Sequence, residues 1–214
     1  GRFRHGGLKR GGALDSTPLQ YGMRIIGGRL KGRGLRAPAG DAVRPTLAKI
    51  REAFFDIVGP RIMDAVFLDL YAGTGAMGIE ALSRGARMVY FVERSGVVST
   101  LLSKNLALIE DGLLDRKSYT VMKMDAKKAL VQLAGSAAKI DIAYVDPPYE
   151  DTRAYGDVVP FLIDGGITRD AFLIGIEHTA HAGGTPGSMK GTLFESLHRR
   201  VYKYGDKYLT IVRR

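Results

Sequence analysis

The most distinctive segment of the chain contains Asp146, Pro147, Pro148 and Tyr149, which directly follow the apolar run Ile140–Val145. Proline fixes φ and has no backbone N–H, so it is disfavoured inside a strand and suits the segment just after one. The pattern therefore predicts a buried strand that delivers a carboxylate to its carboxyl end, where two prolines hold the backbone rigid.

These residue types suit a reaction at an amino group conjugated to an aromatic base. The lone pair of such a nitrogen is delocalised into the ring, so the nitrogen is a poor nucleophile. A carboxylate oxygen and a rigid backbone carbonyl can hold both N–H groups, and the carboxylate can stabilise the nitrogen as it becomes cationic. Tyr149 can stack on a base that has left its helix. A proline-rich turn alone does not explain why Asp146 and Tyr149 bracket the prolines.

A glycine-rich segment, FLDLYAGTGAMGIEA at residues 67–81, forms a second candidate site. Asp69 lies near the end of an apolar run, and the turn after it contains Ala72, Gly73, Thr74 and Gly75. Glycine permits a tight turn and a close approach of the backbone to a ligand. Residues 73–78 also match G-x-G-x-x-G, which by itself is weak evidence for a dinucleotide site. A strand-to-helix turn without a ligand can contain the same glycines.

Two further acids follow the next two apolar runs. Glu93 lies 20 residues after Gly73, where an acid can accept hydrogen bonds from both ribose hydroxyls of an adenosine. The alternative for Glu93 is an exposed carboxylate paired with Arg94. Asp125 could contact an adenine amine with Ala126 beside the ring, but aspartate is equally a favoured helix N-cap. Both roles of Asp125 can coexist.

The positive charge of the chain is concentrated near its start. Residues 1–51 contain twelve Lys or Arg and two Asp side chains, whereas the remaining residues contain twenty of each sign. Such a block is typical of a protein that binds nucleic acid phosphates. A solvated basic tail is the alternative. The segregation favours nucleic acid.

Apolar runs alternate with amphipathic segments over most of the chain. We expect strands at 65–70, 88–92, 119–122, 140–145 and 171–176, helices at 76–83, 95–109, 126–133 and 155–163, and a closing hairpin of 197–204 with 207–212. This alternation predicts an α/β fold, a Rossmann-like, doubly wound and mostly parallel seven-stranded sheet with a C-terminal antiparallel hairpin. A small hairpin within 23–39 and a helix from about Pro45 precede it. The polar segments then all lie at strand carboxyl ends, where such sheets bind ligands.

Together these segments resemble the RsmD-type methyltransferases, which methylate the exocyclic N2 of a guanine in bacterial small-subunit (16S) ribosomal RNA. The resemblance lies in D-x-x-A-G-T-G at 69–75, D-P-P-Y at 146–149, MRIIGGRLKGRGLR at 23–36, R-P-T at 44–46 with Arg51, Glu52, Phe54 and Phe55, and LDLYAGTGAMGIEALSRGA at 68–86. It runs from about Met23 to the C-terminal hairpin. The glycine loop is generic, whereas the N-terminal elements combined with D-P-P-Y are specific.

The resemblance implies S-adenosyl-L-methionine as cofactor and ribosomal RNA, or a partly assembled small subunit, as partner. It implies cofactor contacts from Asp69, Ala72, Gly73, Thr74, Gly75, Glu93, Asp125 and Ala126. It implies a catalytic set of Asp146, Pro147, Pro148 and Tyr149, of which the tyrosine also binds the substrate. Further substrate contacts are expected from Arg29, Lys31, Arg33, Arg44, Thr46 and Arg51. The last three are expected near the active-site mouth, where they face either the RNA or the carboxylate of the cofactor. No metal is required, because methyl transfer from a sulfonium depends mainly on positioning.

Three other functions remain possible from the sequence. D-P-P-Y also serves methyltransferases of DNA adenine N6 or cytosine N4, although the chain is short for a separate sequence-reading domain. A nicotinamide-dependent oxidoreductase could use G-x-G-x-x-G, but no proton-relay motif is evident. The third is a non-catalytic RNA-binding assembly factor, which the intact 146–149 motif disfavours. No His, Asp or Glu cluster has metal-ligand spacing, and we interpret His178 as a loop residue.

The chain organisation predicts three parts. Residues 1–22 are a flexible basic arm or an extension foreign to the native protein, residues 23–58 an RNA-facing element, and residues 59–214 the catalytic domain. There is no cysteine and no apolar run of the roughly 20 residues that a membrane span needs. We therefore expect a cytoplasmic protein without membrane contact, acting as a monomer.

Overall fold

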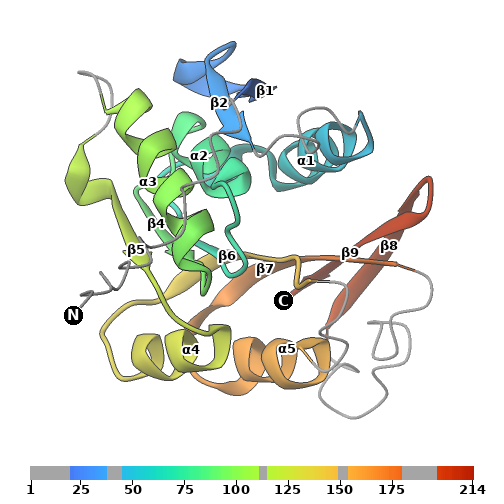
Figure 1. Ribbon diagram of the computed structural model, residues 1–214. Helices are drawn as coiled ribbons and strands as arrows, with labels where there is room; N and C mark the ends of the chain where they lie inside the picture. The colour runs from blue at the N-terminus through green and yellow to red at the C-terminus, as the bar shows by residue number, and fades with distance from the viewer. Residues whose placement is uncertain (1–19, 38–44, 111–114, 149–153, 180–196) are drawn as a thin grey trace, which may run out of the picture.

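The computed structural model describes residues 20–37, 45–110, 115–148, 154–179 and 197–214 (Figure 1). Expectations for residues 1–19, Arg44 and Tyr149 lie outside the described residues. The main sheet contains β3 (Val66–Asp69), β4 (Met88–Val92), β5 (Tyr119–Met122), β6 (Ile140–Val145), β7 (Thr168–Thr179), β8 (His198–Tyr204) and β9 (Lys207–Arg213). A separate hairpin consists of β1 (Gln20–Arg24) and β2 (Gly34–Ala37).

The strand order of the main sheet is β5-β4-β3-β6-β7-β9-β8. The first five of these strands are parallel, and β9 and β8 add an antiparallel edge. The predicted doubly wound sheet with a C-terminal hairpin is thus confirmed. From β3 the chain first builds outward through β4 and β5, and it then returns to add β6 on the other side of β3. The order therefore reverses between β3 and β6, which is where such sheets open a ligand crevice.

Helices cover both faces of the sheet (Figure 1). They are α1 (Pro45–Val58), α2 (Ala76–Ser83), α3 (Gly96–Ile109), α4 (Ala126–Ala134) and α5 (Ala154–Asp164). Helices α1, α2 and α3 lie on one face, and α4 and α5 lie on the other. Short 3-10 turns are η1 (Gly28–Leu30), η2 (Gly59–Ile62) and η3 (Arg116–Ser118).

Two hydrophobic clusters follow from this layering. Successive side chains of a strand point to opposite faces of the sheet and so belong to different clusters. Phe67 packs toward α1–α3, and Leu68 packs toward α4 and α5. Strands buried on both faces need near-continuous apolar sequence, as β3 and β6 have. None of the helices in the described ranges has the length and apolar character that a membrane crossing requires.

The β1–β2 hairpin and α1 belong to the first cluster. Ile25, Leu35 and Phe54 are buried in it together with sheet residues. The predicted boundary at residue 58 remains a prediction, but the two sides of that boundary share one core. Helix α2 also binds the backbone of the hairpin. The side-chain carboxylate of Glu80 accepts hydrogen bonds from the N–H groups of Ile26 and Gly27 at 2.8 and 2.7 Å.

Strand β7 extends further than the apolar pattern indicated. It runs to Thr179, because its last residues pair with the start of β9, with His178 opposite Tyr208. His178 is buried, and its Nε2 lies 2.9 Å from the hydroxyl of Thr210. The interpretation of His178 as a loop residue was therefore wrong.

Candidate active site

A cavity of about 460 Å³ lies at the carboxyl ends of the central strands, where the strand order reverses. Its lining includes Gly73, Glu93, Asp125 and Asp146, each of which follows a different strand of the parallel sheet. The cavity has the size of an ordinary small-molecule site. Four segments that are far apart in sequence thus meet at the position predicted for the ligand.

Asp69, the last residue of β3, binds the start of the helix that follows the glycine loop. Its buried carboxylate accepts a hydrogen bond from the N–H of Gly78 at 2.9 Å, near the start of α2. Burial raises the pKa of Asp69 to about 7, the Gly78 hydrogen bond lowers it, and the nearby Glu93 carboxylate raises it further. Asp69 is not among the residues that line the cavity. The position of Asp69 supports the helix that follows the glycine loop, and its expected contact with the cofactor stays a prediction.

Glu93 joins the loop to the next strand. Its carboxylate accepts hydrogen bonds from the N–H of Gly73 at 3.0 Å and from the N–H of Ser95 at 2.6 Å. Glu93 also lines the cavity. Its carboxylate has more acceptor sites than these two hydrogen bonds use, so it can also accept hydrogen bonds from a ligand. No ion pair joins Glu93 to Arg94 within the described residues. The alternative pairing is therefore absent there.

The three glycines of G-x-G-x-x-G have different tasks. Gly73 has φ +54° and lines the cavity, and a Cβ built on it meets no atom within 4 Å. A Cβ on Gly75 would lie 2.4 Å from Leu102, and one on Gly78 would lie 2.2 Å from Phe91. The open space at Gly73 fits a ligand that approaches the backbone. Gly75 instead permits close packing of the loop against α3, and Gly78 permits close packing of α2 against β4.

The segment after β5 combines the two roles considered for it. Asp125 caps α4, accepting a hydrogen bond from the N–H of Lys127 at 2.9 Å, and it also lines the cavity. The adjacent Ala126 is buried and lines the same cavity. A capping carboxylate has spare acceptor capacity, so capping does not prevent a contact with an adenine amine.

Asp146, Pro147 and Pro148 line the same cavity as Gly73 of the glycine loop. Burial raises the pKa of Asp146 to about 8; the Glu177 and Asp69 carboxylates raise it as well, and the Lys207 ammonium opposes them. Pro147 is buried, whereas Pro148 is exposed. The carboxyl group of Asp146 thus lies at the cavity beside a buried proline. Its contact with a substrate stays a prediction. Tyr149 lies outside the described residues.

Behind Asp146 is a charged group that the sequence did not suggest. Lys207, the first residue of β9, lines the cavity and forms an ion pair with Glu177 of β7. Glu177 also accepts a hydrogen bond from the hydroxyl of Tyr144 at 2.7 Å. Lys207 and Glu177 are 8% and 3% exposed. Neither residue belongs to a motif, so only the pairing of β7 with β9 could have located the ion pair.

The expected RNA contact of Arg51 is contradicted by its position. Arg51 is 4% exposed, and its guanidinium contacts protein groups: the carbonyl of Arg24 at 2.9 Å, the sulfur of Met23, and the Glu80 carboxylate at 3.8 Å. Burial lowers the pKa of Arg51, and the Glu80 carboxylate raises it. Arg51 therefore joins α1 to α2 and to the hairpin. Its neighbour Thr46 is half-buried on α1.

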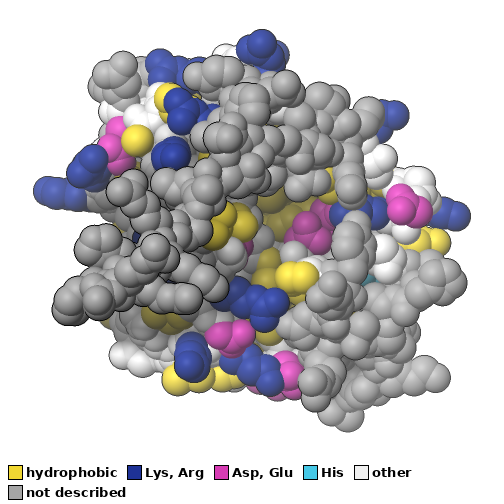
Figure 2. All heavy atoms as spheres, in the orientation of Figure 1, with side chains coloured by type: hydrophobic (Ala, Val, Ile, Leu, Met, Phe, Trp, Pro, Cys, Tyr) yellow, Lys and Arg dark blue, Asp and Glu magenta, His cyan; other side chains and the backbone are white. Residues whose placement is uncertain are grey.

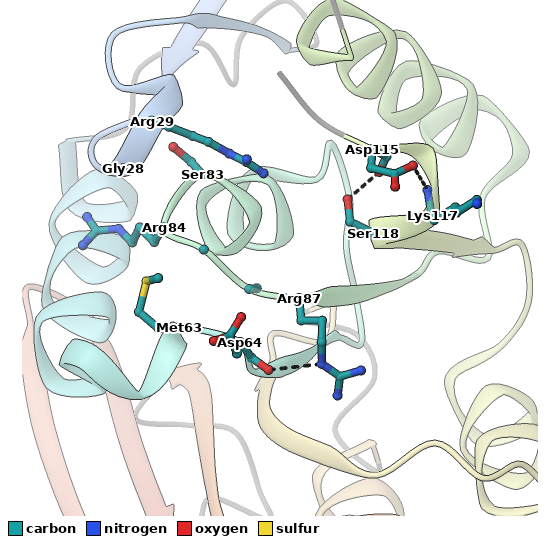
Figure 3. Close-up of a pocket in the computed structure, with 12 residues that line it drawn as sticks. Gly28, Arg29, Met63, Asp64, Ser83, Arg84, Arg87, Asp115, Lys117 and Ser118 are labelled. Atoms are coloured by element: carbon teal, nitrogen blue, oxygen red, sulfur yellow. Dashed lines mark hydrogen bonds between the residues drawn. The ribbon is translucent and has the colours of Figure 1, made fainter. Parts of the chain in front are cut away.

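Arg29 lines a different hollow from the one that contains Asp146. This hollow, of about 720 Å³, includes Asp64, Arg87 and Lys117, which precede β3, β4 and β5 respectively (Figure 3). It is therefore at the amino ends of the strands, the edge opposite the candidate active site. Arg29 therefore lies apart from the candidate active site, because η1 packs against the C-terminal end of α2. Its expected contact with RNA stays a prediction.

The other basic residues of the hairpin lie along its exposed side. Lys31 is exposed, and Arg33 is half-buried, donating a hydrogen bond to the carbonyl of Leu108 at 3.2 Å. Figure 2 shows Lys and Arg side chains at the upper margin, where Figure 1 places β1 and β2. None of these residues lines the cavity. Within the described residues, no group of three or more His, Asp or Glu side chains could hold a metal ion.

Comparisons with known proteins identify the family of the chain. The family model described as "Conserved hypothetical protein 95" matches residues 23–212. The ribosomal RNA small subunit methyltransferase D of Escherichia coli strain K12 is 36% identical over 161 residues, which are 75% of this chain and 77% of that protein. The chain belongs to this family.

Solved structures show the same fold for the family. A structure from Escherichia coli described as a candidate methyltransferase, yhhF, is 33% identical, with a TM-score of 0.72, and the match covers 90% of this chain and 97% of that one. The 16S ribosomal RNA guanine-N2 methyltransferase RsmC of Thermus thermophilus, solved with AdoMet and guanosine, is 20% identical, with a TM-score of 0.64. That match covers 90% of this chain and 49% of RsmC, and it supports the fold alone.

Proposed function

We propose that this member of the family transfers a methyl group from S-adenosylmethionine to the exocyclic N2 of a guanine in small-subunit ribosomal RNA. The observation that carries the proposal is that Asp146, Pro147 and Pro148 line the same cavity as Gly73 and Glu93. The name of the Escherichia coli relative supports ribosomal RNA as the substrate.

The cavity residues fit the cofactor. Glu93 has carboxylate oxygens at the cavity wall for ribose hydroxyls, and Gly73 leaves the adjoining backbone uncovered. Asp125 and Ala126 line the same cavity, which supports the proposal that they hold the adenine amine and ring. When bound, S-adenosylmethionine supplies a methyl group that leaves its sulfonium sulfur as the amino nitrogen bonds to it, and the nitrogen then loses one proton.

The residues of the 146–149 segment orient the acceptor. The Asp146 carboxylate accepts one N–H of the guanine amino group, and a backbone carbonyl of the proline segment accepts the other. These bonds favour the nitrogen geometry in which the lone pair is localised, and the carboxylate stabilises the positive charge that develops. Because Pro147 is buried and its φ is fixed, little ordering is needed at the moment of reaction.

The basic hairpin is proposed to bind the RNA backbone. Lys31 and Arg33 lie on it, and Arg29 extends the basic surface to the amino edge of the sheet. Phosphate contacts so far from the cavity fit a folded RNA or a partly assembled subunit better than a short single strand. We also propose that the protein acts as a monomer, and that it works in the cytoplasm, where its proposed substrate is assembled.

Mapping of modified nucleosides tests the substrate. Small-subunit RNA and immature subunits from cells with and without the protein are digested and analysed by mass spectrometry, and duplex DNA is offered in parallel with labelled cofactor. N2-methylguanosine that depends on the protein is expected at one RNA position. Methyl incorporation only into DNA would assign the chain to the DNA amino-methyltransferases. Thermal stabilisation by NAD(P) but not by S-adenosylhomocysteine would indicate an oxidoreductase.

The Asp146→Ala variant tests the chemistry. Because Asp146 acts on the reacting nitrogen, kcat is expected to fall by about 10²–10³-fold, the range typical of a lost charge-stabilising group. The Kd of S-adenosylhomocysteine should stay within roughly twofold, because other residues bind the cofactor. Asp170→Ala is the matched control, since Asp170 is exposed near the start of β7. Wild-type activity in Asp146→Ala would remove Asp146 from the mechanism.

A further inference from the structure

The peptide groups of the glycine loop are held from three directions. The N–H of Ala72 donates to the carbonyl of Val92 at 2.9 Å, and the N–H of Gly73 donates to Glu93. The carbonyl of Thr74 accepts a hydrogen bond at 2.9 Å from the side-chain amide of Asn105, in α3. The loop conformation therefore depends on a residue that follows it by about 30 positions and that no motif includes.

Asn105 is an unusual residue for its place. It is 0% exposed and lies on the apolar side of α3, among Leu101, Leu102 and Ile109. A buried amide costs stability unless its donors and acceptor are satisfied. Both the amide oxygen and the amide nitrogen of Asn105 have hydrogen-bond partners. These bonds offset the cost of burying the amide.

The other partner of Asn105 is the basic hairpin. Its Oδ1 accepts the N–H of Arg36 at 2.8 Å, and its Nδ2 donates to the carbonyl of Arg36 at 3.0 Å. The side chain thus pairs with β2 much as a neighbouring strand would. The same Nδ2 also donates to Thr74. One amide therefore joins the hairpin to the glycine loop.

We infer that Asn105 is a positioning residue that fixes the cofactor loop, through the carbonyl of Thr74, against the RNA-facing hairpin. This inference rests on the proposed function, because it takes the loop as the cofactor site and the hairpin as the RNA site. Asn105 acts through the loop and does not line the cavity. Its loss leaves Asp146 and the guanine-holding segment in place.

A second buried residue provides the matched comparison. Ser83 of α2 binds the other end of the same hairpin, accepting the N–H of Leu30 at 2.9 Å and donating to the carbonyl of Gly27 at 2.6 Å. It makes no hydrogen bond to the glycine loop within the described residues. Ser83→Ala therefore loosens the hairpin without releasing Thr74.

The test compares Asn105→Asp with Ser83→Ala by calorimetric titration of S-adenosylhomocysteine. The aspartate keeps an acceptor for the Arg36 N–H and loses both donor bonds. Asn105→Asp should weaken S-adenosylhomocysteine binding by about tenfold, as expected for one lost buried hydrogen bond. Ser83→Ala should change that affinity by less than about twofold, although both variants melt at lower temperature. In steady-state assays the KM for the cofactor should rise in Asn105→Asp, with kcat at saturating cofactor close to wild type.

A milder variant covers the case in which Asn105→Asp does not fold. Asn105→Ser retains a polar side chain too short to reach both partners, and hydrogen exchange of the Gly75 amide, which bonds the Ala72 carbonyl at 2.8 Å, reports loop order. Faster exchange there than in Ser83→Ala is expected. Equal exchange, or unchanged cofactor affinity, would overturn the inference. Failure of wild-type protein to methylate ribosomal RNA while it binds the cofactor would instead overturn the proposed function alone.

Discussion

Lys207 forms an ion pair with Glu177 inside the wall of the candidate active site. The pair joins β9 to β7 and lies close enough to Asp146 to act on its ionisation. Within the described residues, the other ionisable groups near Asp146 are Asp69 on β3 and the Tyr144 hydroxyl on β6. Three carboxyl groups and one ammonium therefore share this region of the interior.

The first prediction concerns the pH dependence of methylation. Burial is the chief cause that raises the pKa of the Asp146 carboxyl to about 8. Only the ionised carboxylate can accept the proton of the amino group and stabilise the positive charge that develops on its nitrogen. The kcat/KM for RNA, which reports groups of the free enzyme, should therefore rise as pH increases through about 8. Lys207→Met removes a charge that lowers this pKa, so its midpoint should move up by roughly one pH unit.

Glu177→Gln should move the same midpoint in the opposite direction. It removes a carboxylate that raises the pKa of Asp146 and leaves the Lys207 charge uncompensated. Opposite displacements cannot arise from loss of stability alone. Asp170→Asn should leave the midpoint unchanged. Displacement of both variants in one direction would show that Lys207 and Glu177 do not set the ionisation of Asp146.

The second prediction separates the glycines of the loop. Gly73→Ala places a methyl group at the cavity wall, so S-adenosylhomocysteine binding should weaken by tenfold or more, as expected when ligand and backbone are in close contact. Its stability should fall by only about 1–2 kcal/mol, the cost of a positive φ. Gly78→Ala should instead destabilise the fold by about 1–3 kcal/mol through overpacking against Phe91. Chemical denaturation and titration of the same two variants measure both quantities.

The third prediction concerns Arg51. Arg51→Met removes a buried guanidinium that contacts Arg24 and Glu80, so the free energy of unfolding should fall by about 3–5 kcal/mol. RNA affinity of the folded fraction should be unchanged, because Arg51 is not exposed. Filter binding at a temperature well below the melting point checks this. A selective loss of RNA binding without loss of stability would restore the original expectation.

The fourth prediction concerns the exposed basic side of the hairpin. Replacing Arg29 and Lys31 together with Gln should weaken RNA binding, because each phosphate contact releases counterions. The slope of log Kobs against log salt should become shallower by about 0.7–0.9 per contact. Lys128→Gln, an exposed lysine on α4, is the matched control on another face. An unchanged slope in the double variant would mean that the hairpin does not meet phosphates.

The order of strands and helices could be predicted from sequence because each element of a doubly wound sheet has a local pattern. Continuous apolar runs become β3 and β6, and periodic apolar positions become α1 and α4. The end of β7 could not be predicted. Its last residues are held by pairing with β9, which is distant in sequence.

The candidate site divides in a similar way. Gly73, Glu93, Asp125 and Asp146 could be identified because a strand's carboxyl end fixes which edge its next residue reaches. The task of each glycine could not, because it depends on whether Phe91, Leu102 or open space lies opposite. The positions of Arg29 and Arg51 in the fold could not be predicted either. A basic residue near a motif has the same sequence signature whether it is buried or exposed.

The sequence by itself determined the doubly wound fold, the edge where the site lies and the family, since each depends on local patterns and short motifs. The tertiary structure alone decided which polar residues from distant elements meet. It placed Lys207 beside Asp146, buried Arg51 against Glu80 and joined Asn105 to both Thr74 and Arg36. The physical reason is that hydrogen bonds and ion pairs act over a few ångströms in space. The number of residues that separates two side chains in the sequence does not give the distance between them in the fold.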